Sequence, residues 1–381
     1  MTQTGTEFDE APGTREPDYI TDDDVQDVDE PAEIQPYKYA ITSFGADFPV
    51  DGLVQRLQRG DILVPSFDPE FEAAGGVVGF QRGFIWTRTQ MDRFVESLLL
   101  GLPVPGVFLS SQPNNQFLVL DGQQRLRTLM DYYGGVTGGR EYRLDGVQPQ
   151  FVGLRYKDLD VEDRRRLDNA IVHATIVRQD QPTDDQSSIY MIFERLNTGG
   201  TALQPQEIRV ALFRGPLVNL LRDLNRNDAW RQLYGPPSKR LKDQELILRF
   251  LAFLFTDEEY ARPMKEFLNG YMGRNRNLSV QSADELTAAF VPTCTVLARD
   301  IGPHVFRPLG PVNAAVVDSV MNGIALRLRQ GPVEDGAGLR RAYDALLGDP
   351  KYLVAVSYST AAEDTVSARL RLAREAFAGC T

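Results

Sequence analysis

Histidine and cysteine are nearly absent from this sequence, and their scarcity excludes several kinds of chemistry. The chain has two histidines, His173 and His304, and two cysteines, Cys294 and Cys380, with no Cys-x-x-Cys pair. A zinc site built from cysteine and histidine is therefore all but excluded. Magnesium stays compatible, because it prefers carboxylate and phosphate oxygens. Two distant cysteines do not indicate a disulfide-built secreted domain, so we expect a reducing compartment.

Long apolar runs are also missing. No stretch approaches the roughly 20 apolar residues that cross a bilayer. The N-terminus has neither the basic start nor the apolar segment of a secretory leader. We therefore expect a cytoplasmic protein without membrane contact. Its 381 residues are 42% hydrophobic and 25% charged, which is enough to bury a real core. This length predicts two packed units, or one large elaborated unit.

The negative charge is concentrated in an N-terminal tail. The net charge is -12, and residues 1–34 hold twelve acidic side chains against Arg15, which gives -11. Residues 35–381 then hold 40 basic and 41 acidic side chains, a net charge of -1. Residues 1–34 contain too few apolar groups to offset the conformational entropy that the segment would lose on ordering. We therefore expect a disordered tail. It is either a solubilising leader or an arm that mimics DNA, or inhibits the protein, by covering a basic groove.

The apolar spacing divides the rest of the chain into a mixed part and a helical part. Between residues 53 and 177 it predicts helices and strands in alternation, and after Asp184 nearly everything reads as helix. The expected elements are a helix at 53–57, strands at 60–65, 77–82, 107–109, 117–120 and 170–177, a loop or hairpin at 134–150, and helices at 91–99 (capped by Thr87 or Thr89), 126–133, 189–196, from Pro205 and from Ser282. The fold class is therefore α+β, with domains expected at 35–180 and 181–381 behind the tail.

The strongest chemical signal is the turn that follows the strand at 117–120. Asp121 and Gly122 end that strand, and Gln123, Gln124 and Arg125 open a helix. The first N–H groups of a helix have no intrahelical partner and carry partial positive charge, so such a turn can bind an anion. Gly122 permits close approach of a phosphate, and Arg125 can donate to it twice. The structural alternative is that Asp121 only caps the helix while Arg125 pairs with a neighbouring acid.

Three further candidates have structural explanations that are at least as good. Arg82, which follows Gln81 and lies near Trp86, can bind phosphate or form an ordinary surface pair. Arg195 and Asn197 lie at a helix C-terminus, where a cation complements the helix dipole, so a purely structural role explains them as well. His173 stands in an apolar strand, and we expect it to be a satisfied core residue rather than a base.

Taken together, these segments resemble one known family. The segments are Phe80-Gln81-Arg82, Ser97-Leu98-Leu99-Leu100-Gly101-Leu102-Pro103, Leu120-Asp121-Gly122-Gln123-Gln124-Arg125-Leu126-Arg127-Thr128-Leu129 and Phe193-Glu194-Arg195-Leu196-Asn197-Thr198-Gly199-Gly200. This order resembles the GmrSD-type N-terminal domain family over about residues 38–275. The resemblance implies a ParB/sulfiredoxin-like mixed α/β core followed by a mainly helical domain.

The resemblance also implies a function in restriction or anti-phage defence. Family members are thought to bind and slowly hydrolyse nucleoside triphosphates through the Asp-Gly-Gln-Gln-Arg turn. Carried over by position, the catalytic residues are Asp121, Gln123, Gln124 and Arg125, Asp121 holds Mg²⁺, and the remaining nucleotide contacts are Gln81, Arg82, Gly122, Thr128 and Asn197. Members that cut DNA usually carry an appended His-Asn-His nuclease, which two scattered histidines cannot build. We therefore expect a separate nuclease subunit as a partner.

Two other functions stay open on the sequence. The first is a non-enzymatic adaptor that uses the same turn to hold a DNA phosphate and sense a modification. The nearly neutral body argues against strong non-specific DNA binding, which depends on lysine and arginine. The second, nuclease action by the core itself, is disfavoured. The sequence decides neither the nucleotide, nor a DNA modification, nor whether the chain forms homo-oligomers.

Overall fold

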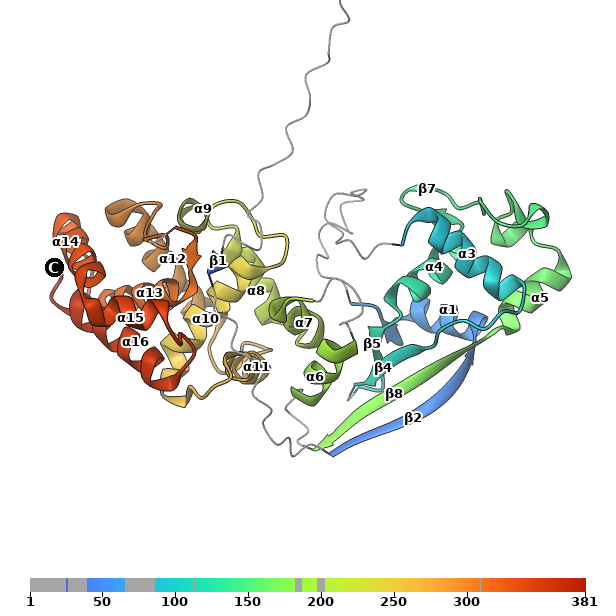
Figure 1. Ribbon diagram of the computed structural model, residues 1–381, viewed down its shortest axis with the longest axis horizontal. Helices are drawn as coiled ribbons and strands as arrows, with labels where there is room; N and C mark the ends of the chain where they lie inside the picture. Colours follow the sequence, from blue (N-terminus) through green and yellow to red (C-terminus); the bar gives the residue numbers. More distant parts are fainter. Residues whose placement is uncertain are drawn as a thin grey trace, which may run out of the picture.

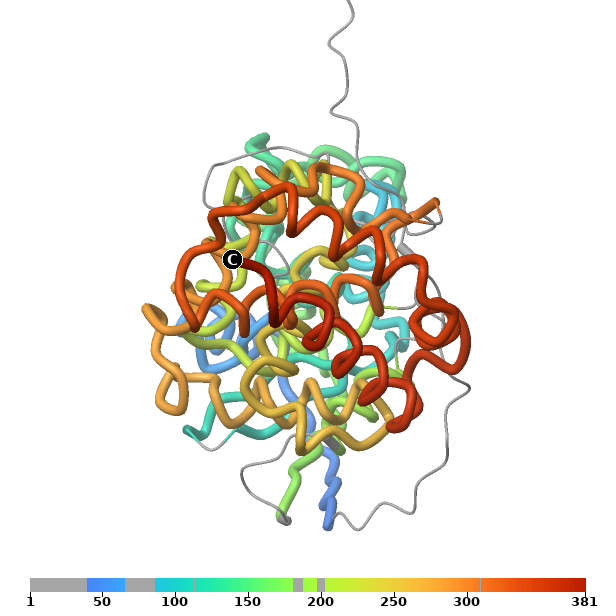
Figure 2. Tube along the Cα trace, turned by 90° about the vertical axis from the view of Figure 1, so that its left-hand side faces the viewer, coloured from blue at the N-terminus to red at the C-terminus, as the bar shows by residue number. Residues whose placement is uncertain are grey.

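The computed structural model describes residues 25–26, 40–65, 86–112, 114–181, 187–196, 203–308 and 310–381. They form a part built on a sheet and a part built from helices, which lie side by side in Figure 1. The C-terminus lies at the far end of the helical part, which faces the viewer in Figure 2. This arrangement confirms the α+β fold class. None of the described helices is long and apolar enough to span a bilayer.

The central sheet is mixed, with the strand order β2-β8-β4-β5-β3. β2 (Ala40–Pro49) pairs antiparallel with β8 (Ile171–Gln181), and β8 pairs parallel with β4 (Val107–Ser111). β4 pairs antiparallel with β5 (Phe117–Asp121), and β5 pairs parallel with β3 (Ile62–Leu63). β2 and β8 make a long ribbon along the lower side of the sheet part in Figure 1, and one end of this ribbon lies below α6 (Ser187–Leu196).

Both faces of the sheet are buried at the inner strand β5. In β5, Leu118 and Leu120 point to one face and Val119 to the other, and each is at most 2% exposed. Val119 joins the core shared with four helices, α1 (Val50–Arg59), α3 (Arg88–Leu99), α4 (Gln123–Gly134) and α5 (Val161–Asn169). Leu118 and Leu120 join the larger core of the helical part. The continuous apolar run Phe117–Leu120 is therefore explained by burial of β5 on both of its faces.

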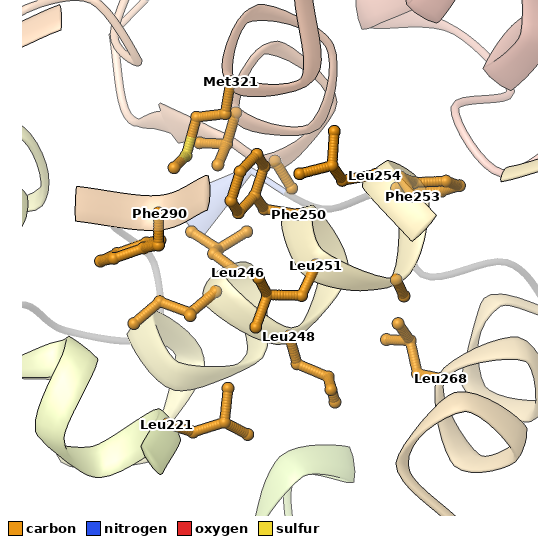
Figure 3. Close-up of a cluster of buried hydrophobic side chains, with 14 of the residues drawn as sticks. Leu221, Leu246, Leu248, Phe250, Leu251, Phe253, Leu254, Leu268, Phe290 and Met321 are labelled. Atoms are coloured by element: carbon orange, nitrogen blue, oxygen red, sulfur yellow. The ribbon is translucent and has the colours of Figure 1, made fainter. Parts of the chain in front are cut away.

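The helical part surrounds α10 (Lys242–Thr256). The residues of α10 from Asp243 to Leu254, apart from Glu245, are buried, so this helix is enclosed on all sides, as Figure 3 shows. The other helices are α6 (Ser187–Leu196), α7 (Pro205–Leu212), α8 (Pro216–Asn225), α9 (Asp228–Tyr234), α11 (Met264–Arg274), α12 (Ala283–Val296), α13 (Ala314–Leu328), α14 (Gly336–Gly348), α15 (Pro350–Ser357) and α16 (Glu363–Ala378). Short elements complete the described chain: β6 (Val136–Thr137), β7 (Arg140–Glu141), the 3-10 turns η2 (Pro149–Phe151), η3 (Tyr156–Asp158) and η4 (Asp257–Glu259), and the π-helical η5 (Leu297–Ile301).

A buried ionic triad ties three of these helices together. Asp318 on α13 accepts hydrogen bonds from Arg249 on α10 at 2.7 Å and from Arg369 on α16 at 2.9 Å. The three side chains are at most 3% exposed. Charges so far from water are tolerated only when they are paired, so the triad fixes how these helices pack.

Several local predictions are confirmed. Thr87 caps α3 in a reciprocal capping box with Gln90, and Ser282 caps α12. Pro205 is the first residue of α7, and Gly135 ends α4 in the left-handed conformation. The hairpin expected within 134–150 is β6–β7. The strand expected at 77–82 and the segment 197–200 lie outside the described residues.

Two features depart from the expectations. β2 was not anticipated: its residues up to Gly45 are exposed, so its sequence has no apolar alternation to reveal it. In the tail, β1 (Val25–Gln26) pairs in parallel with β9 (Val312–Asn313), which enters α13. The expectation of an entirely unstructured tail therefore does not hold at these two residues. The domain boundary expected at 180 stays a prediction, although β8 ends at Gln181.

Candidate functional site

The candidate site begins where β5 ends and α4 begins. Gly122 is the N-cap of α4, with φ 93° in the left-handed region, and no side chain caps this helix. A Cβ at Gly122 would stand 2.5 Å from Cγ1 of Val107. Glycine is thus required both by the backbone conformation and by the close packing. The alternative in which Asp121 caps α4 is wrong, because the helix begins one residue too late for that.

Arg125 folds back across this turn. Its Nη2 donates to Oδ2 of Asp121 at 2.8 Å and to the carbonyl oxygen of Gly106 at 2.9 Å. The Arg125 side chain is 15% exposed and that of Asp121 is 43% exposed. The pairing of Arg125 with a neighbouring acid is therefore observed. It is compatible with anion binding, because a half-exposed pair can exchange partners at little cost.

One atom of this arginine lacks a hydrogen-bond partner. Nε of Arg125 is buried and has no acceptor among the residues that the structure describes. The N–H groups of Gln123, Gln124 and Arg125 begin α4, where no intrahelical acceptor precedes them. Positive charge and free donors therefore meet at one end of one helix, as an anion site requires.

The other residues predicted to contact the nucleotide differ in how near they lie to this turn. Oε1 of Gln124 accepts from the backbone N–H of Trp86 at 3.4 Å, so this side chain faces the start of α3. Gln123 is half-buried in the first turn of α4. Thr128 is 1% exposed, one turn deeper in the helix, and its nucleotide contact stays a prediction. Gln81, Arg82 and Asn197, also expected at the nucleotide, lie outside the described residues.

The carboxylate of Asp121 offers one oxygen atom that could bind magnesium. Its Oδ1 accepts no hydrogen bond from any described residue, and the side chain faces solvent. No cluster of three or more His, Cys, Asp or Glu side chains suited to a metal occurs in the described ranges. Magnesium, however, often binds through one or two carboxylates together with substrate phosphates. Asp121 fits such a site only when a phosphorylated ligand completes it.

His173 is not the core residue that its apolar neighbours suggest. Its side chain is 59% exposed on β8, and Nδ1 lies 2.8 Å from Oδ1 of Asp47 on the paired strand β2. The alternation of the strand explains this, since Val172 and Ala174 take the buried face. The expectation of a buried histidine is wrong.

Backbone atoms supply contacts that sequence patterns cannot reveal. The carbonyl oxygen of Gly106 and the N–H of Trp86 hold Arg125 and Gln124 in place. Gly106 itself lies tightly against the neighbouring strand, since a Cβ there would stand 2.6 Å from the carbonyl oxygen of His173. A glycine at position 106 therefore indicates that two strands pack closely beside the site.

The site and its surroundings lie within a segment that matches a known family model. Residues 77–214 match the family described as the GmrSD restriction endonuclease, N-terminal domain. The match spans α3 to α7, including the whole Asp-Gly-Gln-Gln-Arg turn, and confirms the resemblance seen in the sequence. A domain of this family implies a role in a restriction or defence system. No curated protein matches the chain.

Proposed function

We propose that the chain is the nucleotide-binding subunit of a restriction system, which hydrolyses a nucleoside triphosphate slowly and relies on a separate nuclease. The observation that carries this proposal is the uncapped N-terminus of α4 with the half-buried guanidinium of Arg125 beside it. Phosphoryl transfer needs positioning and charge neutralisation more than covalent chemistry, and these groups supply both.

Each residue of the turn has a distinct part in this proposal. The N–H groups of the first α4 turn and the partly exposed guanidinium of Arg125 bind phosphate oxygens. Gln123 and Gln124 orient the attacking water, which is a weak form of activation and implies a slow reaction. Asp121 holds Mg²⁺, which when bound neutralises charge on the phosphates. Gly122 supplies the left-handed backbone turn from which the first N–H groups of α4 point toward the ligand.

Variants of the turn test the binding step. Arg125→Ala should weaken nucleotide binding by about 1.5–3 kcal/mol, the usual contribution of a hydrogen bond to a charged group. Arg125→Lys should restore only part of this, because lysine lacks the planar two-pronged donor. Gln124→Ala should keep binding close to normal and lower turnover. Calorimetric titration and phosphate release with each of the four nucleotides measure these effects.

Arg127 provides the matched control on the same helix. Two residues further on, it points away from Arg125 and donates to the carbonyl oxygen of Pro65 at 3.1 Å. Arg127→Ala should therefore leave nucleotide affinity unchanged. Unchanged affinity in a well-folded Arg125→Ala protein would sink the phosphate assignment. If that variant instead loses thermal stability alone, the pair with Asp121 is purely structural.

The missing nuclease chemistry gives a second test. His173 and His304 are both exposed, the first on β8 and the second beyond α12, so they do not form one site. We expect this chain alone to leave plasmid DNA intact with magnesium or manganese. Cleavage that survives repurification and disappears in Asp121→Ala would show that the core is itself a nuclease.

A further inference from the structure

A cavity of about 220 Å³ lies where the sheet meets the helical part. We name it the junction cavity. Its sheet side is formed by the edge strand β3 and by the β4–β5 hairpin, and its helical side by the end of α7 and the segments after α7 and α11. The lining residues are Leu63, Gln112, Asn114, Gln116, Leu118, Ala211, Leu212, Arg214 and Arg276. Polar side chains on an apolar floor are typical of ligand sites.

The cavity is distinct from the turn at Asp121. Gln116 precedes β5 and Asp121 ends it, so the two residues stand at opposite ends of one strand. Four residues of extended chain lie between them, which places their Cα atoms roughly 17 Å apart. The lining residue nearest to the turn along β5 is Leu118, so the cavity lies beside the start of the strand and the turn lies at its end.

The charged side chains described in the wall of this cavity are positive. Among the described residues that line it, two are arginines and none is acidic. Arg276 donates from Nε to the carbonyl oxygen of Arg214 at 2.5 Å, and no described carboxylate pairs with it. Burial lowers the pKa of Arg276, and no acidic neighbour raises it again. A half-buried guanidinium of this kind is poorly compensated.

The arginines are held in place by backbone contacts. Nη2 of Arg214 donates to the carbonyl oxygen of Val64, so it links the helical part to the end of β3. The carbonyl of Arg276 accepts from the N–H of Leu217, and a Cβ on Gly215 would stand 2.7 Å from the same oxygen. Preorganised guanidinium groups lose less freedom on binding an anion.

We propose that the junction cavity is a second anion site, which binds a phosphate group of a small phosphorylated ligand against Arg276 and Arg214. The guanidinium of Arg276 takes the phosphate oxygens, and Oε1 of Gln112, which accepts no hydrogen bond from any described residue, is available to a donor on the ligand. Because its walls come from both parts of the molecule, a bound ligand stabilises their junction. This site does not depend on nucleotide hydrolysis at Asp121.

The test uses the full chain in an Arg125→Ala background, which weakens the first anion site, with inorganic pyrophosphate as the probe. Calorimetry should show residual binding, and pyrophosphate should raise the melting temperature. Adding Arg276→Gln should lower this residual affinity at least tenfold. Arg371→Gln, at an exposed pair with Glu375, is the matched control and should change nothing.

A second variant keeps the test decisive if Arg276→Gln fails to fold. Gln112→Glu keeps the side-chain shape, and the hydroxyl of Ser110 can donate to the new carboxylate. It places a negative charge in the cavity, so it should abolish pyrophosphate binding while the melting temperature holds or rises. The proposal is overturned if the Arg125→Ala protein binds no pyrophosphate, or if Gln112→Glu binds it normally. It is also overturned if a short oligonucleotide binds there and pyrophosphate does not.

Discussion

Both parts of the molecule contain an arginine–aspartate contact, but the two contacts differ in almost every physical respect. At the end of the sheet, Asp121 is 43% exposed and shares one hydrogen bond with Arg125. In the helical core, Asp318 is fully buried between Arg249 and Arg369. Water can replace either partner of the first contact and neither partner of the second. The first is therefore suited to exchanging partners with a ligand, and the second to holding helices together.

Removal of the buried acid is the strongest test of this comparison. Asp318→Ala leaves Arg249 and Arg369 without their shared counter-charge, and we expect the free energy of unfolding to fall by about 3–5 kcal/mol. Urea unfolding measures this effect. Arg371→Ala, which breaks an exposed pair with Glu375, should change stability by less than about 1 kcal/mol. Equal effects of the two substitutions would contradict the comparison.

A substitution at the turn should affect both stability and binding. Gly122→Ala places a Cβ against Val107 at a positive φ, which should cost about 1–3 kcal/mol of stability and weaken nucleotide binding. Gly135 is the matched control at the other end of α4: its φ is 72° and nothing lies within 4 Å of an added Cβ. Gly135→Ala should carry only the smaller backbone penalty. Equal nucleotide affinity in the two variants would argue against the turn as a binding site.

Deletion of the tail should have a smaller effect. Removing residues 1–34 eliminates β1, whose two residues pair with β9. Hydrogen bonds of this kind contribute about 0.5–1.5 kcal/mol each, so we expect a loss of no more than about 2 kcal/mol. Removing residues 1–24 keeps β1 and should change nothing in a thermal melt. A rise in DNA affinity after either deletion would support a tail that covers a basic surface.

The smallest effect concerns a buried acid in the α/β part. Asp92 on α3 is 1% exposed, and burial raises its pKa above the usual value of 3.8, although Arg88 opposes the shift. The folded state therefore holds a proton more tightly than the unfolded state does. Stability should decrease as pH rises through the interval between the two pKa values. Asp92→Asn should flatten this slope, which denaturation at a series of pH values measures; an unchanged slope would assign it to other groups.

Local patterns predicted the elements whose signals lie close together in the chain. The cap at Thr87, the stop at Gly135 and the apolar run Phe117–Leu120 each depend on a few neighbouring residues. The Asp-Gly-Gln-Gln-Arg turn was found in the same way, and it lies within the segment that matches the GmrSD restriction endonuclease N-terminal domain model. Backbone partners of the site, such as the carbonyl of Gly106, left no such pattern.

The sequence by itself determined the α+β class, the order of most elements and the position of the turn, because these follow from spacing and capping over a few residues. Tertiary structure decided which charges are buried. Arg249 and Asp318 each stand in an apolar run, but they are 69 positions apart, so no local pattern pairs them. It also exposed His173, paired β1 with β9 and placed Arg276 beside Gln112. Such contacts join distant segments, so only the packed fold brings them together.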